Sequence, residues 1–260
     1  RGCQGKPRRG RLAVNSEEYH LMYSIEDTFW WYKGMRQSTF ALLHGLMQGG
    51  TDRMILDAGC GTGGMMQPLS QLGSAVGIDF AEEATNLANQ RERGMVMRGS
   101  VTDLPFAAAT FDLVTCFDVL YHLAVCDDAA ALKELSRVLK PGGYLFVRVP
   151  AYNFLRGHHD VVVHTRHRYS LGELTTKITS AGLQPIRATH ANMFLFPLAG
   201  AKRLWETLPT SRTSVQSDLQ PVPKVLNDAL LGVLSFESWL IKRTSLPFGL
   251  SAICLAVKKG

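Results

Sequence analysis

The 260-residue sequence is poor in cysteine and has no apolar run of the ~18 residues needed to cross a membrane. Its five cysteines are scattered, and no two of them form a Cys-x-x-Cys pair. This usage argues against a disulfide framework and a zinc site, and it is typical of a reducing cytoplasm. The basic residues near the start are not followed by an apolar stretch, so no signal peptide is expected. The sequence therefore predicts a cytoplasmic protein without a metal.

Outside its first residues the chain has almost no net charge. The formal net charge is +6, but five positive charges precede residue 12, which leaves +1 for the remainder. A nucleic-acid-binding domain would carry a basic stripe on its folded body, so we expect no nucleic-acid partner. Residues 1–15 are glycine-containing and lack apolar periodicity, which predicts a disordered basic arm.

What the sequence does contain is a regular alternation of short apolar segments and helical patterns. Helical patterns are predicted at 17–48 in two pieces, and then at 63–72, 82–93, 129–139 and 171–181. Strands are predicted at 54–57, 75–79, 95–98, 113–116, 144–149, 185–190 and 251–257. Strands separated by helices of this length are typical of βαβ units and a parallel sheet. The pattern predicts an α/β fold of the doubly wound, Rossmann-like type.

The pattern changes before the last strand. Two apolar-rich helical stretches, 193–208 and 222–242, flank a polar linker at 209–220, and together they exceed an ordinary connection. We expect an added layer packed on the core. The alternative is a hydrophobic pocket or a membrane-facing patch for a lipid-like acceptor, a peripheral membrane contact that Lys242 and Arg243 beside Trp239 would favour.

These segments predict one domain at 16–260. Within it we expect an N-terminal helical cap at 16–50, a catalytic core at 51–191 and 250–258, and a helical insertion at 192–249.

The most informative segment is 54–64, where an apolar strand ends at Asp57 and runs into glycines at alternate positions, Gly59, Gly61 and Gly63. Glycines allow a sharp turn and close approach of the backbone to a ligand, and the next helix directs unpaired N–H groups at it. An NAD-dependent oxidoreductase, the alternative enzyme class, would show Gly-x-Gly-x-x-Gly. Asp57 also offers an acceptor for an ammonium group.

A second acid supports a nucleoside ligand. Asp79 lies 22 residues after Asp57, at the end of the second predicted strand. A carboxylate there can accept both ribose hydroxyls, and Phe80 can lie against the adenine. The glycine loop alone is weak evidence, but the loop, the spaced acid and the alternating pattern together are specific.

On these segments the chain resembles the class I S-adenosylmethionine-dependent methyltransferases over residues 50–185. Segments 99–106, 111–122 and 135–143 match further motifs of the family in order. Within the class, the chain is similar to the small-molecule branch that includes ubiquinone O-methyltransferases. The resemblance implies a seven-stranded sheet whose last strand is antiparallel. It also implies S-adenosylmethionine as cofactor and in-line methyl transfer to a small-molecule or lipid-like acceptor.

The resemblance also implies a cofactor site. Where the family often has an acid on the adenine amino group, this chain has Ser100, so the backbone of Val101 would carry more of the recognition. Arg36 is either a partner of the cofactor carboxylate or a surface arginine. The predicted cofactor-binding residues are Asp57, Gly59, Cys60, Gly61, Gly63, Asp79, Phe80, Ser100, Val101, Phe117 and Arg36.

An acceptor hydroxyl or thiol needs a base, and histidines cluster in the segment after the fifth predicted strand. His159 and His164 are the candidate catalytic and substrate-contacting residues, with a structural loop as the alternative. A metal site of His159, His164 and His167 is not favoured, because cysteine partners and HExxH spacing are missing. His122 is expected to be a packed histidine.

Trp30, Trp31 and Tyr32 form an aromatic cluster before a predicted helix. They are either a lid that excludes water and contacts the substrate, or rings that pack the N-terminal helices on the sheet. A non-catalytic adenosylmethionine-binding subunit is a further alternative function, disfavoured by the many histidines. No pattern in the sequence specifies the methyl acceptor, the atom methylated or the oligomeric state.

Overall fold

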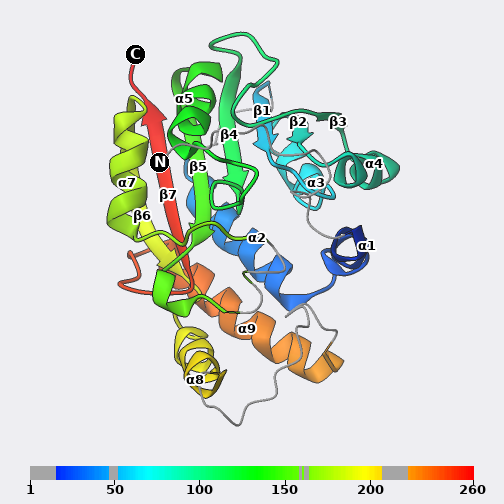
Figure 1. Cartoon of the computed structure of the whole chain (residues 1–260), viewed down its shortest axis with the longest axis vertical. Helices are drawn as coiled ribbons and strands as arrows, with labels where there is room; N and C mark the ends of the chain where they lie inside the picture. Colours follow the sequence, from blue (N-terminus) through cyan, green and yellow to red (C-terminus); the bar gives the residue numbers. More distant parts are fainter. Residues whose placement is uncertain (1–15, 47–51, 158–159, 161–163, 207–221) are drawn as a thin grey trace.

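The computed structural model describes residues 16–46, 52–157, 160, 164–206 and 222–260 (Figure 1). A single sheet runs through them. Its strands are β1 (Met54–Ala58), β2 (Ser74–Asp79), β3 (Met95–Arg98), β4 (Phe111–Phe117), β5 (Leu139–Pro150), β6 (Leu183–Ala191) and β7 (Ser251–Lys258).

The strand order is β3-β2-β1-β4-β5-β7-β6. Strands β1 to β5 pair in parallel, whereas β7 is antiparallel to both of its neighbours, β5 and β6. In Figure 1 the red β7 runs opposite to the green β5 beside it. The predicted seven-stranded sheet with an antiparallel last strand is confirmed. Because the order reverses between β1 and β4, the carboxyl ends of these strands open a crevice in which doubly wound folds bind ligands.

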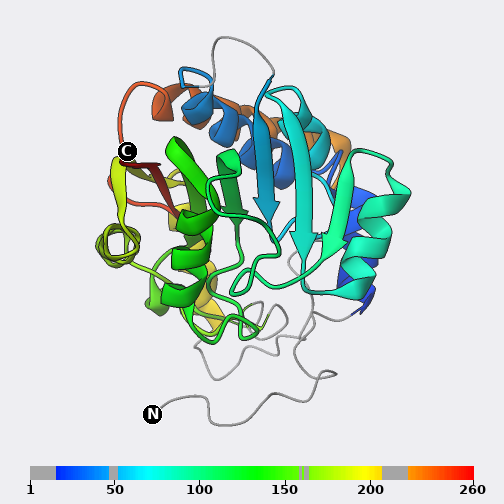
Figure 2. The ribbon, with the colours of Figure 1, turned by 90° about the horizontal axis from the view of Figure 1, so that it is seen from above.

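Helices cover both faces of this sheet, as Figure 2 shows from above. One face packs against α5 (Asp128–Val138) and α7 (Leu171–Ser180), whose leucines and isoleucine join the larger apolar cluster. The other face packs against α2 (Trp30–Leu43), α3 (Met66–Ser70) and α9 (Lys224–Ile241). The remaining helices are α1 (Ser16–Ile25), α4 (Glu82–Gln90), α8 (Phe196–Glu206) and the short 3₁₀ turn η1 (Asn153–Leu155).

The predicted helix at 63–72 is wrong at its start. Helix α3 begins only at Met66, because Gly59, Gly61 and Gly63 all have positive φ angles, 86°, 54° and 84°, and lengthen the loop. Helix α7 begins as its sequence predicts, since the Ser170 hydroxyl accepts the backbone N–H of Glu173 at 3.1 Å.

The helical segment between β6 and β7 is an added layer, as expected. Helix α9 packs along α2 so closely that a side chain at Gly34 would collide with Leu234. Its buried Glu237 accepts the backbone N–H groups of Asn192 and Phe194, which joins α9 to the end of β6. The predicted arm at 1–15 and linker at 209–220 lie outside the described residues. None of the helices in the described part is long and apolar enough to cross a membrane.

Candidate active site

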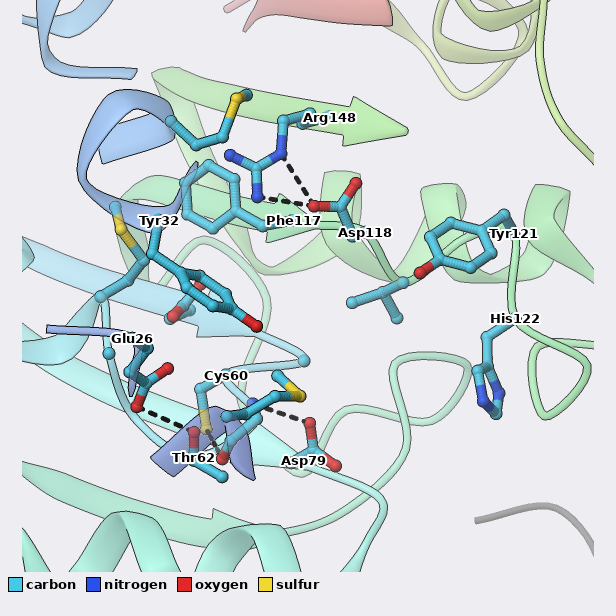
Figure 3. Close-up of a pocket in the computed structure, with 18 of the residues that line it drawn as sticks. Glu26, Tyr32, Cys60, Thr62, Asp79, Phe117, Asp118, Tyr121, His122 and Arg148 are labelled. Atoms are coloured by element: carbon cyan, nitrogen blue, oxygen red, sulfur yellow. Dashed lines mark hydrogen bonds and ion pairs between the residues drawn. The ribbon is translucent and has the colours of Figure 1, made fainter. Parts of the chain in front are cut away.

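A cavity of about 530 Å³ opens at the carboxyl ends of the parallel strands (Figure 3). One wall, which we call the loop side, consists of lining residues near the ends of β1 and β2 together with Glu26: Glu26, Asp57, Gly59, Cys60, Gly61, Thr62, Gly64, Asp79, Phe80 and Ala81. We call the opposite wall the far side. It consists of Trp30 at the start of α2, lining residues of the turn 118–122 after β4, Arg148 on β5, and Asp160 and Arg168 from the segment between η1 and α7. Figure 3 shows Asp118, Arg148 and Tyr121 across the cavity from Cys60, Thr62 and Asp79.

Backbone geometry builds the loop side. A side chain at Gly59 would collide with Val119, so glycine lets this turn pass beneath the far side. The Asp79 carboxylate accepts the N–H of Gly61 at 2.9 Å and that of Ala81 at 2.9 Å. Asp79 is therefore held by the same loop that it faces.

The third glycine of the loop lies apart from the cavity. Gly63 does not belong to the lining of the cavity, since it faces α4, where an added Cβ would lie 3.1 Å from that of Ala88. Gly63 serves close packing between the loop and a helix rather than the ligand.

Three carboxylates make the loop side acidic. Asp57 is 1% exposed and accepts the Thr115 hydroxyl at 2.8 Å, yet burial raises its pKa to about 7. Burial also raises the pKa of Asp79 and of Glu26, although Glu26 pairs with Arg91 at 2.6 Å and accepts the Thr62 hydroxyl at 2.8 Å. Because desolvation outweighs the partners available, this wall favours a positively charged ligand.

Four other predicted cofactor residues also line the cavity. The Phe80 side chain is 40% exposed, and Val101 is buried. The Ser100 hydroxyl forms a hydrogen bond with the Thr102 hydroxyl at 2.8 Å, so it already has a partner within its own turn. The Sγ atom of Cys60 lies against the backbone of β2 at Gly77, which leaves the main chain of Cys60 toward the cavity.

Phe117 and Arg36 lie where α2 meets the strand ends. The Phe117 ring lies beneath the guanidinium of Arg148, 5.1 Å from its centroid. Arg36 lines the cavity, but it donates to the carbonyl oxygens of Gly64 at 3.1 Å and Glu26 at 2.7 Å. Its observed contacts tie α2 to the glycine loop, and its pairing with a cofactor carboxylate stays a prediction.

The aromatic cluster lies between the cavity and the apolar core, and its contact with a substrate stays a prediction. Trp30, Trp31 and Tyr32 all line the cavity, while Trp31 also packs in the apolar cluster shared with α9. The Nε1 atom of Trp30 is buried and has no hydrogen-bond partner in the described part of the chain. In Figure 3 the Tyr32 hydroxyl points into the cavity, and burial raises its pKa.

The histidine predictions need correction. His159 lies outside the described residues. His164 does not appear in the cavity wall, because its ring stands edge-on against His122, with centroids 5.9 Å apart, behind the turn. His122, expected to be merely packed, lines the cavity instead, because the turn after β4 brings it there.

The protonation of His122 follows from its contacts. Its Nδ1 accepts the N–H of Ala124 at 3.0 Å, so in the neutral ring the proton is on Nε2, which is buried without a partner. Burial, together with the nearby His164, lowers its pKa to about 4. At neutral pH His122 therefore offers a hydrogen-bond donor rather than a base.

Sequence reasoning missed the two ion pairs of the far side. Arg148 donates twice to Asp118, at 2.9 and 2.6 Å, and Arg168 donates twice to Asp160, at 2.7 and 3.0 Å. A signal existed for Arg148, since a lone charge interrupts the apolar strand Leu-Phe-Val-Arg-Val. Each pair is neutral as a unit, so the far side lacks the excess negative charge of the loop side.

Comparisons with known proteins agree with this geometry. Residues 56–147 match the model of a methyltransferase domain. The demethylmenaquinone methyltransferase of Lactiplantibacillus plantarum is 30% identical over 227 residues, which cover 73% of this chain and 90% of that protein. The ubiquinone biosynthesis O-methyltransferase of Paracidovorax citrulli is 29% identical, over 52% of this chain and 59% of its own length.

Solved structures share the fold. A methyltransferase of Thermotoga maritima aligns with a TM-score of 0.57 and 19% identity, over 93% of this chain and 99% of its own. The geranyl diphosphate C-methyltransferase of Streptomyces coelicolor, solved with S-adenosylhomocysteine, aligns with a TM-score of 0.57 and 16% identity. The alignment covers 85% of this chain and 75% of that one. Sheet order, glycine loop, spaced acids and these relatives converge, and the chain belongs to the class I S-adenosylmethionine-dependent methyltransferases that act on small molecules.

Proposed function

We propose that this chain binds S-adenosylmethionine in the cavity and methylates an uncharged, ring-containing small molecule or lipid of the quinol or phenol type. The observation that carries the proposal is the contrast between the two walls. On the loop side Asp57 and Asp79 have no cationic partner among the described residues, whereas the far side holds neutral ion pairs, aromatic rings and donors without a described partner.

The residues of the loop side fit the cofactor. Asp79 would accept the ribose hydroxyls, Asp57 the ammonium group, and Phe80 with Val101 would flank the adenine. Because Gly59 and Gly61 have no side chains, the ligand can approach the main chain closely at these two positions. When bound, the cofactor supplies an activated methyl group on a good leaving group.

The far side would orient the acceptor. The Nε1–H of Trp30 and the Nε2–H of His122 are buried donors without partners, so an acceptor oxygen would satisfy them. The names of the quinone-pathway relatives support a ring of this kind. Positioning of this sort is the main contribution that a protein makes to an in-line transfer.

The structure disfavours the NAD-dependent alternative. A pyrophosphate would have to enter beside Asp57 and Asp79, whose carboxylates disfavour an anion. The N–H groups of Gly59 and Cys60 are also occupied, because both donate to the carbonyl of Ile78, at 2.7 and 3.0 Å.

Calorimetry and a transfer assay test the proposal. We expect S-adenosylmethionine and S-adenosylhomocysteine to bind and NAD not to bind. Tritium from the labelled methyl donor should pass to members of a quinol and phenol panel. Binding of NAD alone would overturn the cofactor assignment. Binding of the donor without transfer to any acceptor would instead support a non-catalytic subunit.

A further inference from the structure

Helix α9 has an apolar face that is exposed to solvent and that the described residues do not cover. Residues Val225, Ala229, Val233 and Phe236 recur at helical spacing and point outward, with exposures of 83%, 38% and 54% for Val225, Val233 and Phe236. The inward positions Leu234, Glu237, Ser238 and Ile241 are buried. The apolar residues of α9 thus extend beyond the face that packs on the core, and an exposed apolar face marks a surface for interaction.

The outer face ends in a cluster of rings, which we call the ring patch: Phe194, Phe236 and Trp239. Trp239 is 50% exposed and stacks on Phe236 with centroids 5.6 Å apart and an interplanar angle of 17°. Phe194, 43% exposed, lies 5.8 Å from Phe236. Three adjoining rings half in solvent form a surface suited to an apolar partner.

The charges around the ring patch are positive. The guanidinium of Arg243 lies 4.0 Å from the centroid of the Trp239 ring, and Lys242 beside it is exposed. The acids of α9 do not oppose them, because Glu237 is buried inward and Asp228, near the other end, pairs with Lys224 at 2.6 Å. Aromatic rings flanked by basic side chains are the composition of a helix lying at a lipid–water interface.

We propose that the outer face of α9 binds an anionic lipid bilayer. The helix lies parallel to the surface, with the ring patch among the headgroups and upper acyl chains, while Lys242 and Arg243 meet lipid phosphates. Positive charge on both exposed cations selects an anionic surface over a neutral one.

The position of α9 suggests a function for its contact with the bilayer, and this function rests on the proposed methyl transfer to a lipid-like acceptor. The side-chain oxygen of Asn227 on α9 accepts the backbone N–H of Trp30 at 2.9 Å, and Trp30 lines the cavity. In Figure 1, α9 lies along α2, the helix that carries this wall. Docking of α9 would therefore hold the cavity close to a membrane that contains a lipid-like acceptor.

Cosedimentation with vesicles tests the contact directly. The full chain should bind vesicles of phosphatidylcholine with phosphatidylglycerol, bind vesicles of phosphatidylcholine alone more weakly, and lose the difference at high salt. The double variant Phe236→Ser, Trp239→Ser should reduce binding at least about tenfold, since it removes the inserting area. Lys242→Glu with Arg243→Glu should remove only the preference for anionic lipid.

Two controls keep the test decisive. Met95→Ser removes another exposed apolar side chain, 64% exposed on the edge strand β3, and should leave vesicle binding unchanged. Affinity for S-adenosylhomocysteine should be unchanged in every variant, which separates this proposal from the cofactor assignment. Absence of vesicle binding, or equal binding by the ring-patch variant, would overturn the proposal. A dimer that the same variant dissociates would assign the face to a second copy instead.

Discussion

The two walls of the cavity differ in how the chain builds them. On the loop side, Asp79 accepts N–H groups only 18 and 2 residues away, from Gly61 and Ala81. On the far side, Trp30 is held by Asn227, 197 residues distant, and Arg148 by Asp118, 30 residues distant. The contacts of Asp79 thus belong to a short sequence motif, whereas those of Trp30 and Arg148 exist only after separate segments have packed.

The walls also differ in charge. On the loop side burial dominates and raises the pKa values of Asp57 and Asp79. On the far side burial also acts on Asp160, but the hydrogen bonds and charge of Arg168 outweigh it, and the pKa of Asp160 falls below its ordinary value. In charge, the loop side therefore favours a cationic ligand, whereas the ion pairs of the far side are balanced within the protein.

The largest effect should come from breaking a far-side ion pair. Asp160→Ala leaves the Arg168 guanidinium, 11% exposed, without its bidentate partner. The expected loss is about 3 kcal/mol in the free energy of unfolding, measured by urea denaturation, because a buried charge is then uncompensated. Asp228→Ala breaks an exposed pair with Lys224 and should leave the unfolding midpoint unchanged. Equal effects of the two substitutions would contradict the assigned role of burial.

A substitution on the loop side should change the affinity for the ligand more than the free energy of unfolding. Asp79→Ala removes a charged acceptor of two backbone N–H groups and, in our proposal, of the ribose hydroxyls. We expect binding of S-adenosylhomocysteine in calorimetry to weaken about 100-fold, as for two charge-assisted hydrogen bonds. The nearby Glu82→Ala, which loses only an exposed pair with Arg98, is the matched control. An unchanged affinity for Asp79→Ala would refute the ribose assignment.

The same difference explains what sequence alone can predict. The alternating strands and helices follow from periodicity, and the positions of Asp57, Gly59 and Asp79 follow from spacing, because these contacts are local or set by topology. The antiparallel direction of the last strand came from the resemblance to the family. His122 lines the cavity and His164 does not, the reverse of the expected placement, since which ring faces the cavity depends on a turn at Val119 that carries no sequence pattern. Asp160 with Arg168, and Asn227 with Trp30, had no sequence signal, because neither pair lies at a spacing that implies contact.

The charge of the loop side predicts a pH dependence of ligand binding. Asp57 has a pKa of about 7 in the free protein, and an ammonium group beside it would favour the ionised form. Affinity for S-adenosylhomocysteine should thus rise about tenfold per pH unit below about 7 and then level, with proton release seen by calorimetry in different buffers. Asp57→Asn should remove this dependence; a slope that persists in the variant would assign it to another group.

Asp57 predicts the opposite trend for stability without ligand. Its folded pKa of about 7 exceeds the ordinary value of 3.8, so the folded state favours the protonated form. The resulting stabilisation is complete below the ordinary pKa and is lost as pH rises through about 7. The melting temperature of the wild type should therefore fall between weakly acidic and weakly alkaline buffer, and that of Asp57→Asn should fall less.

The smallest effect should mark acceptor recognition on the far side. Trp30→Phe keeps an aromatic ring on α2 but removes the buried Nε1–H that lacks a partner. If this donor binds an oxygen of the acceptor, KM for a soluble acceptor found in the transfer assay should rise roughly fivefold, the value of one neutral hydrogen bond of about 1 kcal/mol. Affinity for S-adenosylhomocysteine should not change, because the loop side is untouched. Trp239→Phe makes the same chemical change outside the cavity and should alter neither constant. A rise in KM for both variants would mean that the effect is not specific to the acceptor, and the two walls would then no longer divide the ligands as proposed.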